Sequence, residues 1–121
     1  MAEEYAKRIA RFASVELLEL KASGAEREAE ALLGKVRGEL WALDQRGTQI
    51  TSEELAARVG RTATLTFCIG GDEGLSPRVR EAASFVWSLS KLTLPHRLAR
   101  VIALEQLYRA FEILRGGPYH K

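Results

Sequence analysis

The sequence is poor in cysteine: Cys68 is the only one among its 121 residues. A single thiol excludes an internal disulfide and any metal site assembled from several cysteines. Cys68 lies inside the apolar stretch TLTFCIGG. We therefore expect a buried structural thiol rather than a nucleophile.

The sequence also lacks a long uncharged apolar run of the kind that crosses a membrane. Its first residues, MAEEYAKRIARF, are charged and amphipathic and contain no apolar core of a signal peptide. Charged residues make up 28% and hydrophobic residues 46% of the chain, proportions that are typical of a soluble globular protein. We therefore expect a single domain over residues 1–121, in the cytoplasm and without a membrane partner.

Familiar catalytic motifs are missing as well. The glycine-rich stretch GGDEG at 70–74 matches neither the dinucleotide-binding pattern nor the phosphate-binding loop. We find no metal-ligand spacing, no nucleophile–base pair and no close pair of carboxylates. This scarcity fits a reaction in which the protein mainly positions two substrates, without a metal.

The apolar pattern predicts helices over 2–12 and 25–36, strands over 15–20 and 39–44, and turns at 21–24 and 45–49. Thr51 or Ser52 can cap a helix that runs to about residue 59. A buried strand over 63–69 follows, and Ser76 and Pro77 then begin a helix to about residue 84. A strand over 85–89 precedes a final helix from Pro95 to residue 114. Such alternation predicts an α/β fold with a mostly parallel sheet.

Two unusual loops, IGGDEG and SLSKLTLPH, begin where predicted strands end. In parallel sheets, ligands bind beyond the carboxyl ends of the strands. The paired glycines at 70–71 suit either a close approach to a ligand or a tight turn before a helix. The backbone of residues 89–94 could bind a flat heterocycle between leucines, but its spacing alone favours an ordinary strand-to-helix connection.

The C-terminal quarter is basic, with a charge of +4 over residues 91–121 against −2 over residues 1–90. This asymmetry indicates a polyanionic partner, although many solvated helices are basic. The helix over 96–114 is apolar on most sides, so it is either the central core helix or a helix that also contacts a second subunit. Arg97 and Arg100 near its start suit a bound anion or simple solvation. The tail over 117–121 is expected to fray unless it folds over the ligand loops.

Several blocks in the same order resemble the ribosomal RNA large subunit methyltransferase H family of the SPOUT class. They are IGGDEGL, SLSKLTLPH, ARVIALEQLYRAF and RGGPYHK, supported earlier by EEYAKRIARF, VELLEL and LWALDQRG. The resemblance implies an α/β-knot fold with a C-terminal deep trefoil knot over about 65–121. It also implies a homodimer with a shared active site. The implied reaction uses S-adenosylmethionine to methylate N3 of a pseudouridine in 23S ribosomal RNA of the assembled ribosome.

The same resemblance assigns individual residues. The implied cofactor contacts are Leu43, Gly70, Leu89, Ser90, Lys91, Leu92, Thr93 and Leu94. Tyr119 and His120 match the family's C-terminal tail, and Arg109 matches a helix position near the site. We hypothesise that His120 accepts the proton of N3 and that Arg109 or Arg97 offsets the developing negative charge.

One departure from the family pattern is at the front of the chain. Members begin with a strand, whereas this chain begins inside the following helix, on the order of twenty residues later. We therefore expect an N-terminal strand to be missing. The alternative functions are a knotted dimer that binds S-adenosylmethionine or RNA without catalysis, and an α/β dimer of unrelated role. The mild net charge of +2 favours an assembled ribosome over free RNA as the partner.

Overall fold

The computed structural model describes residues 2–12, 14–19, 29–31, 33–62, 64–69 and 75–120. The elements in chain order are α1 (Ala2–Ile9), β1 (Ser14–Glu19), β2 (Glu39–Thr48), α3 (Ser52–Val59), β3 (Thr64–Ile69), α4 (Pro77–Ala82), β4 (Phe85–Trp87) and α5 (His96–Leu114). Residues 29–31 and 33 are also helical, within the helix predicted over 25–36. The turn predicted at 21–24 and the glycine-rich loop at 70–74 lie outside the described residues.

The described strands form one parallel sheet in the order β1-β3-β2-β4. Trp41 of β2 is paired with Phe67 on one side and Phe85 on the other. The predicted α/β class and parallel sheet are therefore confirmed. The missing N-terminal strand stays a prediction.

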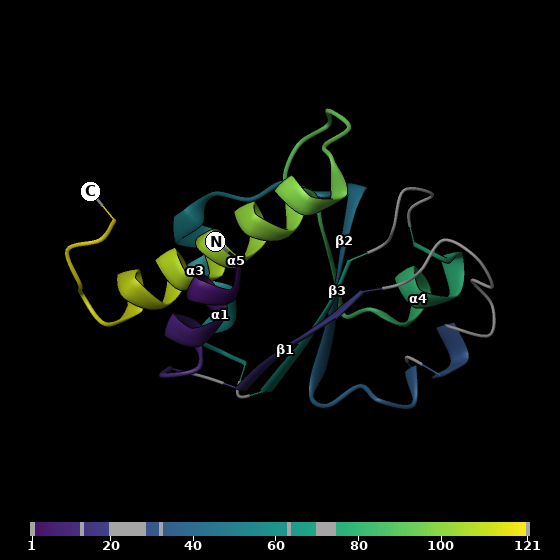
Figure 1. The fold of residues 1–121 in the computed structure, drawn as a ribbon, viewed down its shortest axis with the longest axis horizontal. Helices are drawn as coiled ribbons and strands as arrows, with labels where there is room; N and C mark the ends of the chain where they lie inside the picture. The colour runs from purple at the N-terminus through teal and green to yellow at the C-terminus, as the bar shows by residue number, and fades with distance from the viewer. Residues whose placement is uncertain are drawn as a thin grey trace.

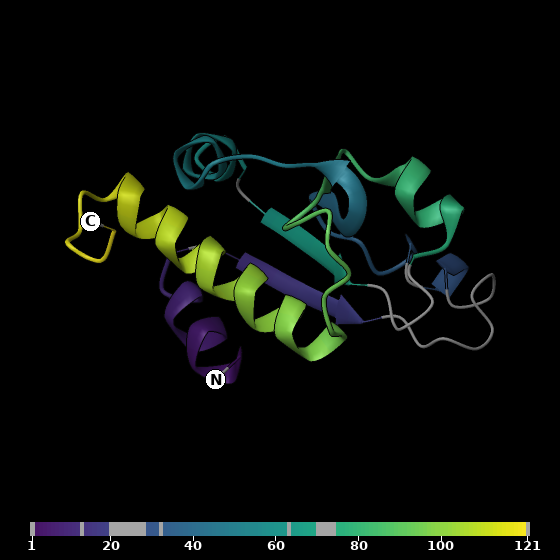
Figure 2. The same ribbon diagram turned by 90° about the horizontal axis from the view of Figure 1, so that it is seen from above.

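Helices cover both faces of the sheet. Figures 1 and 2 show α1, α3 and α5 on one face and α4 on the other. Alternate residues of β2 follow this division, because successive side chains of a strand point to opposite faces. Trp41 and Leu43 belong to the larger core beneath α3 and α5. Leu40 and Ala42 belong to a smaller core with Cys68 and Val79.

The predicted helix starts are confirmed by their caps. Thr51 accepts a hydrogen bond from the Glu54 backbone N–H, and the Glu54 carboxylate accepts one from the Thr51 N–H, which completes a capping box. Ser76 caps α4 ahead of Pro77. Both helices therefore begin where the sequence signals place them.

The turn predicted at 45–49 is wrong. Strand β2 continues to Thr48, with a register irregularity after Leu43, so that Leu43 and Thr48 both pair with Trp87. Gly47 permits this close approach, because a Cβ there would lie 2.5 Å from the Val86 carbonyl oxygen. Segment 44–48 therefore passes directly against β4.

Several other predicted boundaries differ from the structure. Helix α1 ends at Ile9 rather than at residue 12, and β1 spans Ser14–Glu19 rather than 15–20. Helix α4 ends at Ala82 rather than near 84, because the Ser84 N–H bonds to the Leu40 carbonyl of β2 over 2.8 Å. Strand β4 ends at Trp87 rather than 89, and its successor Ser88 turns away to bond with segment 45–48.

Helix α5 lies across the sheet between α1 and α3 (Figure 2). Its buried side includes Leu104, Leu107 and Phe111, while Leu98 remains 48% exposed. The prediction that α5 is a core helix is therefore confirmed for one side, and the second-subunit contact stays a prediction. None of the described helices is long and apolar enough to cross a membrane.

Candidate functional site

The three residues assigned to catalysis by resemblance lie together at the C-terminal end of α5. Arg109 Nη1 lies 3.0 Å from His120 Nδ1, and Arg109 Nε donates to Glu105 Oε1 over 2.8 Å. The Arg109 guanidinium also lies 4.9 Å from the centre of the Tyr119 ring. The tail therefore folds back onto α5 instead of fraying, and it forms a half-buried polar cluster there.

Tyr119 is held by two other tyrosines. Its hydroxyl lies 3.5 Å from that of Tyr5, and its ring meets the Tyr108 ring edge-on with centres 4.8 Å apart. The hydrogen bond to Tyr5, burial and the nearby Glu105 carboxylate raise the pKa of Tyr119 to about 12. Tyr119 therefore carries its proton at neutral pH and can donate a hydrogen bond, but it is not a base there.

The neighbours of His120 fix its tautomer. Arginine can only donate hydrogen bonds, so Nδ1 of His120 must accept from Arg109. Nε2 lies 2.9 Å from Glu53 Oε1 and must then carry the proton that it donates to this carboxylate. In this arrangement the imidazole is neutral, and its basic nitrogen faces Arg109.

Glu53 was not identified from sequence as a site residue. It lies in the first turn of α3, and 67 positions separate it from His120. Its hydrogen bond from His120 is the main reason that the pKa of its carboxyl lies below the usual range. No local signal could have found this pairing, because it depends on how the tail folds back across α3 and α5.

The loop between β4 and α5 is attached to the irregular part of β2. Buried Ser88 donates its hydroxyl to the Gln45 and Ser90 carbonyls over 3.1 and 3.0 Å. Thr93 donates to the Gln45 side chain over 3.2 Å, and the Leu92 N–H donates to the Ser90 hydroxyl over 2.9 Å. These bonds hold the loop in one shape without using charged groups.

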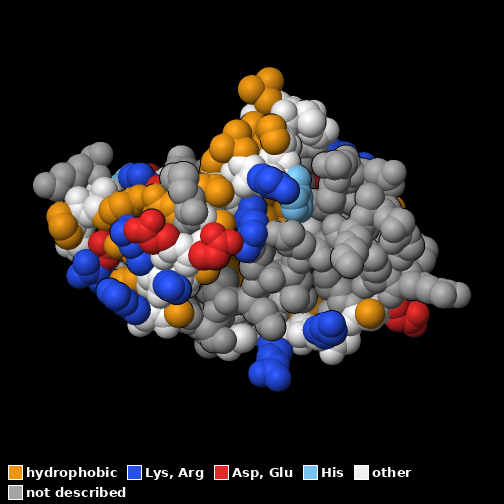
Figure 3. Space-filling view, in the orientation of Figure 1, with side chains coloured by type: hydrophobic (Ala, Val, Ile, Leu, Met, Phe, Trp, Pro, Cys, Tyr) orange, Lys and Arg blue, Asp and Glu red, His pale blue; other side chains and the backbone are white. Residues whose placement is uncertain are grey.

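The loop presents features that suit an adenosine group. Leu92 is 73% exposed, and Leu89 packs against the core. Within the described part of the chain, the backbone N–H groups of Lys91, Thr93 and Leu94 have no hydrogen-bond partner. Figure 3 shows apolar side chains gathered on this protruding loop. Free donors beside apolar side chains match the polar edge and flat faces of a heterocycle.

The other two assigned cofactor residues differ from the loop. Leu43 ends the regular part of β2 and is only 9% exposed, so its side chain belongs to the core. Gly70 lies outside the described residues. Next to Leu43, buried Asp44 lies 3.3 Å from Arg46 and 3.7 Å from Arg80. Although burial opposes ionisation, hydrogen bonds from Arg46 and both positive charges hold the pKa of Asp44 below its usual range.

The loop and the cluster of Arg109, Tyr119 and His120 lie at opposite ends of α5. Pro95 and Arg109 are separated by about 20 Å along the helix axis. Figure 1 shows the loop projecting beside β2 and β4 and the C-terminal tail at the far end of α5. Arg97 lies at the loop end and Arg109 at the tail end. Within one chain, therefore, the tail does not fold over the ligand loop.

In the regions that the structure describes, no group of three histidine, cysteine or acidic residues could hold a metal ion. Cys68 is fully buried, as predicted, and burial raises the pKa of its thiol to about 12. It lies in the smaller core, away from the exposed tail and loop.

Comparison with known proteins agrees with these features. The family described as "Predicted SPOUT methyltransferase" matches residues 1–120. A relative from Anaeromyxobacter, named ribosomal RNA large subunit methyltransferase H, is 46% identical over 133 residues, covering 98% of this chain and 87% of its own length. A relative of the same name from Gloeobacter violaceus is 47% identical over 128 residues, covering 97% and 85%. The chain therefore belongs to the ribosomal RNA large subunit methyltransferase H family of SPOUT methyltransferases.

Proposed function

We propose that this protein transfers a methyl group from S-adenosylmethionine to N3 of a pseudouridine in 23S ribosomal RNA, within the assembled ribosome in the cytoplasm. The observation that carries the proposal is the cluster of Arg109, Tyr119 and His120. Family membership supplies the reaction class, because the relatives are named as large subunit ribosomal RNA methyltransferases. The cluster supplies the polar groups that such a reaction needs.

The active site is shared between two copies of the chain. The loop that would hold the cofactor and the catalytic cluster lie at opposite ends of α5, about 20 Å apart. Two α5 helices packed antiparallel about a two-fold axis would bring the tail of one chain to the loop of the other. Leu98, which is 48% exposed, and the partly buried Val101 and Ile102 offer an apolar surface for that contact.

The cofactor is held by the loop after β4. The N–H groups of Lys91, Thr93 and Leu94 would bind the polar edge of the adenine, and Leu89 and Leu92 would offer apolar contacts to it. Ser90 maintains the loop, and Gly70 and the backbone of Leu43 complete the binding region. When bound, S-adenosylmethionine supplies a methyl group on a positively charged sulfur, so no metal is needed.

The catalytic cluster acts on the pseudouridine. N3 must lose its proton as it gains the methyl group, and His120 accepts that proton at Nδ1. Because Nδ1 now accepts a hydrogen bond from Arg109, substrate binding must first separate these two side chains. Arg109, or Arg97 of the loop-bearing chain, then offsets the negative charge that develops on the base. Tyr119, protonated at neutral pH, donates a hydrogen bond to a carbonyl of the base.

The cofactor loop belongs to a deep trefoil knot formed by residues from about 65 to 121. The close passage of segment 44–48 against β4 supports this proposal. Ser88 bonds through its N–H to Thr48 and through its hydroxyl to Gln45, and Gly47 lies against Val86. A knot would fix the cofactor loop without help from metals or disulfides.

The proposal is tested by methyl transfer from labelled S-adenosylmethionine to ribosomes that lack the modification. The alternative is a knotted dimer that binds the cofactor or RNA without turnover. The fully paired state of His120, with Arg109 on one nitrogen and Glu53 on the other, is the observation that favours this alternative. Binding of the cofactor without transfer of label would support it.

A further inference from the structure

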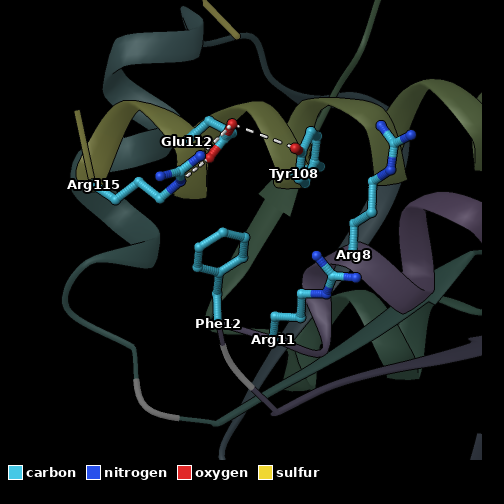
Figure 4. Close-up of a pocket in the computed structure, with 6 residues that line it drawn as sticks. All are labelled: Arg8, Arg11, Phe12, Tyr108, Glu112 and Arg115. Atoms are coloured by element: carbon cyan, nitrogen blue, oxygen red, sulfur yellow. Dashed lines mark hydrogen bonds and ion pairs between the residues drawn. The ribbon is translucent and has the colours of Figure 1, made fainter. Parts of the chain in front are cut away.

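A second polar site lies between α1 and α5, beside the catalytic tail. It is a cavity of about 470 Å³ lined by Arg8, Arg11, Phe12, Tyr108, Glu112 and Arg115. Figure 4 shows the side chains from the end of α1 opposite those from α5. None of these residues is among the site residues predicted from the sequence.

The cavity carries excess positive charge. Its three arginines face a single carboxylate, Glu112, which bonds to Arg115 and to the Tyr108 hydroxyl. The hydrogen bond from Arg115 holds the pKa of Glu112 below its usual range, so this carboxylate is ionised and already neutralised by Arg115. Arg8 is paired with Glu4 over 2.7 Å, so Arg11 is the arginine that adds unmatched positive charge to the cavity.

Arg8 and Arg11 differ in how they are held. Arg8 donates to exposed Glu4 over 2.7 Å and lies 5.5 Å from the centre of the Tyr108 ring, so its position is defined. Arg11 is exposed, and its guanidinium has no partner among the residues that the structure describes. A guanidinium without a partner, next to one whose position is fixed, can bind a phosphate through several charge-assisted hydrogen bonds.

Aromatic side chains complete the site. Phe12 stacks on Phe111 with ring centres 5.7 Å apart and nearly parallel planes, yet it remains 39% exposed. Tyr108 lines the cavity and also contacts the Tyr119 ring. Tyr108 therefore lies between the cavity and the tail that carries Tyr119. Arginines beside an exposed aromatic ring are the usual combination for an unpaired nucleotide of RNA.

We propose that this cavity binds a nucleotide of the substrate RNA close to the methylated base, with its phosphate on Arg8 and Arg11 and its base or sugar against Phe12. This inference rests on the proposed function for the identity of the RNA. It adds a substrate-binding site at the end of α1, beside the tail that carries Tyr119 and His120. Because Arg11 does not contact the cluster of Arg109, Tyr119 and His120, it contributes to RNA affinity and not to the chemical step.

The test compares Arg11→Gln with Arg78→Gln, using the full-length protein and ribosomes that lack the modification. Arg78 is a matched control, since it is exposed on α4 at the opposite face of the sheet and pairs only weakly with Glu30 at 3.9 Å. Binding to ribosomes is measured at several salt concentrations, and kcat and KM for methyl transfer are measured in parallel. Size-exclusion chromatography and thermal unfolding monitor assembly and stability.

We expect Arg11→Gln to weaken ribosome binding and raise KM about three- to tenfold, with kcat unchanged and the salt dependence reduced by about one phosphate contact. Phe12→Leu, which keeps apolar packing on Phe111, should weaken binding to a similar extent without changing the salt dependence. Arg78→Gln should match wild type. Equal affinity and salt dependence for Arg11→Gln and wild type would overturn the proposal, as would a change in oligomeric state, which would assign the cavity to a contact between copies.

The binding measurement separates this inference from the proposed function. Wild-type protein that binds ribosomes but transfers no methyl group contradicts the proposed function, while weaker binding by Arg11→Gln would still support the cavity as an RNA site. Normal transfer with no effect of Arg11→Gln contradicts the cavity proposal alone. Wild-type protein that does not bind ribosomes contradicts both.

Discussion

Nη1 of Arg109 lies 3.0 Å from Nδ1 of His120, so the only basic nitrogen of this imidazole is covered by a guanidinium. Glu105 orients the guanidinium from one side, and Glu53 accepts the hydrogen bond that the Nε2–H of the ring donates. The pair is therefore organised but not yet ready to accept a proton. Under the proposed function, the substrate must draw Arg109 away, so that binding of the pseudouridine exposes Nδ1 of His120 as the proton acceptor.

Replacing His120 tests whether this side chain accepts the proton of N3. We expect His120→Ala to lower the rate of methyl transfer about 10²- to 10⁴-fold near neutral pH, because the proton on N3 loses its acceptor. Since hydroxide can remove the proton from N3 in solution, the variant should recover activity as pH rises. Single-turnover rates across pH 6–9 on ribosomes would show this behaviour. A variant with the wild-type rate across neutral pH would contradict the role of His120.

The shared site can be tested by co-expressing two inactive chains. One carries His120→Ala, and the other carries Leu92→Pro, which removes the N–H that donates to Ser90 and disrupts the cofactor loop. Random pairing makes half of the dimers mixed, each with one intact site, so about a quarter of the wild-type activity should return. Each variant expressed alone is the control. Absence of activity in purified mixed dimers would show that loop and tail act within the same chain.

Substitution of Gly47 tests whether segment 44–48 passes closely against β4. A Cβ at this position would lie 2.5 Å from the Val86 carbonyl oxygen, so Gly47→Ala should lower the free energy of unfolding by about 1–3 kcal/mol through overpacking. Gly34→Ala is the matched control, because its nearest new contact is an ordinary 3.5 Å. Urea unfolding of both variants provides the comparison. Equal stability of Gly47→Ala and wild type would show that the two segments do not meet as described.

The thiol of Cys68 should be inert in the native state. Burial raises its pKa from 9.0 to about 12, so the thiolate that reacts with disulfide reagents is absent at pH 8. Folding favours the neutral thiol, so its contribution to stability is present below pH 9 and is lost as pH rises toward 12. We expect reaction with a chromogenic disulfide only after denaturation. The control is a chain with Cys68→Ala and Leu92→Cys. Leu92 is 73% exposed, so a cysteine at this position should react with the disulfide reagent at once. Rapid labelling of native Cys68 would contradict its burial.

The parts of the fold that could be predicted from sequence are those set by local signals. The Thr51 and Ser76 caps act within one turn of helix, and both were found where predicted. The path of residues 45–48 could not be predicted, because glycine at 47 signals a turn in sequence but here allows close contact with Val86. Long-range packing overrode the local turn preference.

In the candidate site, too, contacts within one helix could be predicted from the sequence, whereas contacts between distant elements could not. Arg109 and Glu105 are one helical turn apart, so their pairing follows from helical spacing alone. Tyr119 and His120 were assigned through family resemblance, but their return to α5 depends on the turn at Gly116, where φ is +73°. The partners Tyr5 and Glu53 come from distant elements, and only the assembled fold brings them to the tail.

The most direct measurement is transfer of labelled methyl groups from S-adenosylmethionine to assembled ribosomes that lack the modification, with free large subunits as the comparison. Our account predicts incorporation at N3 of a pseudouridine of 23S ribosomal RNA, with assembled ribosomes preferred. Failure to incorporate label, in a protein that binds the cofactor by calorimetry, would contradict the account and leave a binding protein that does not catalyse transfer.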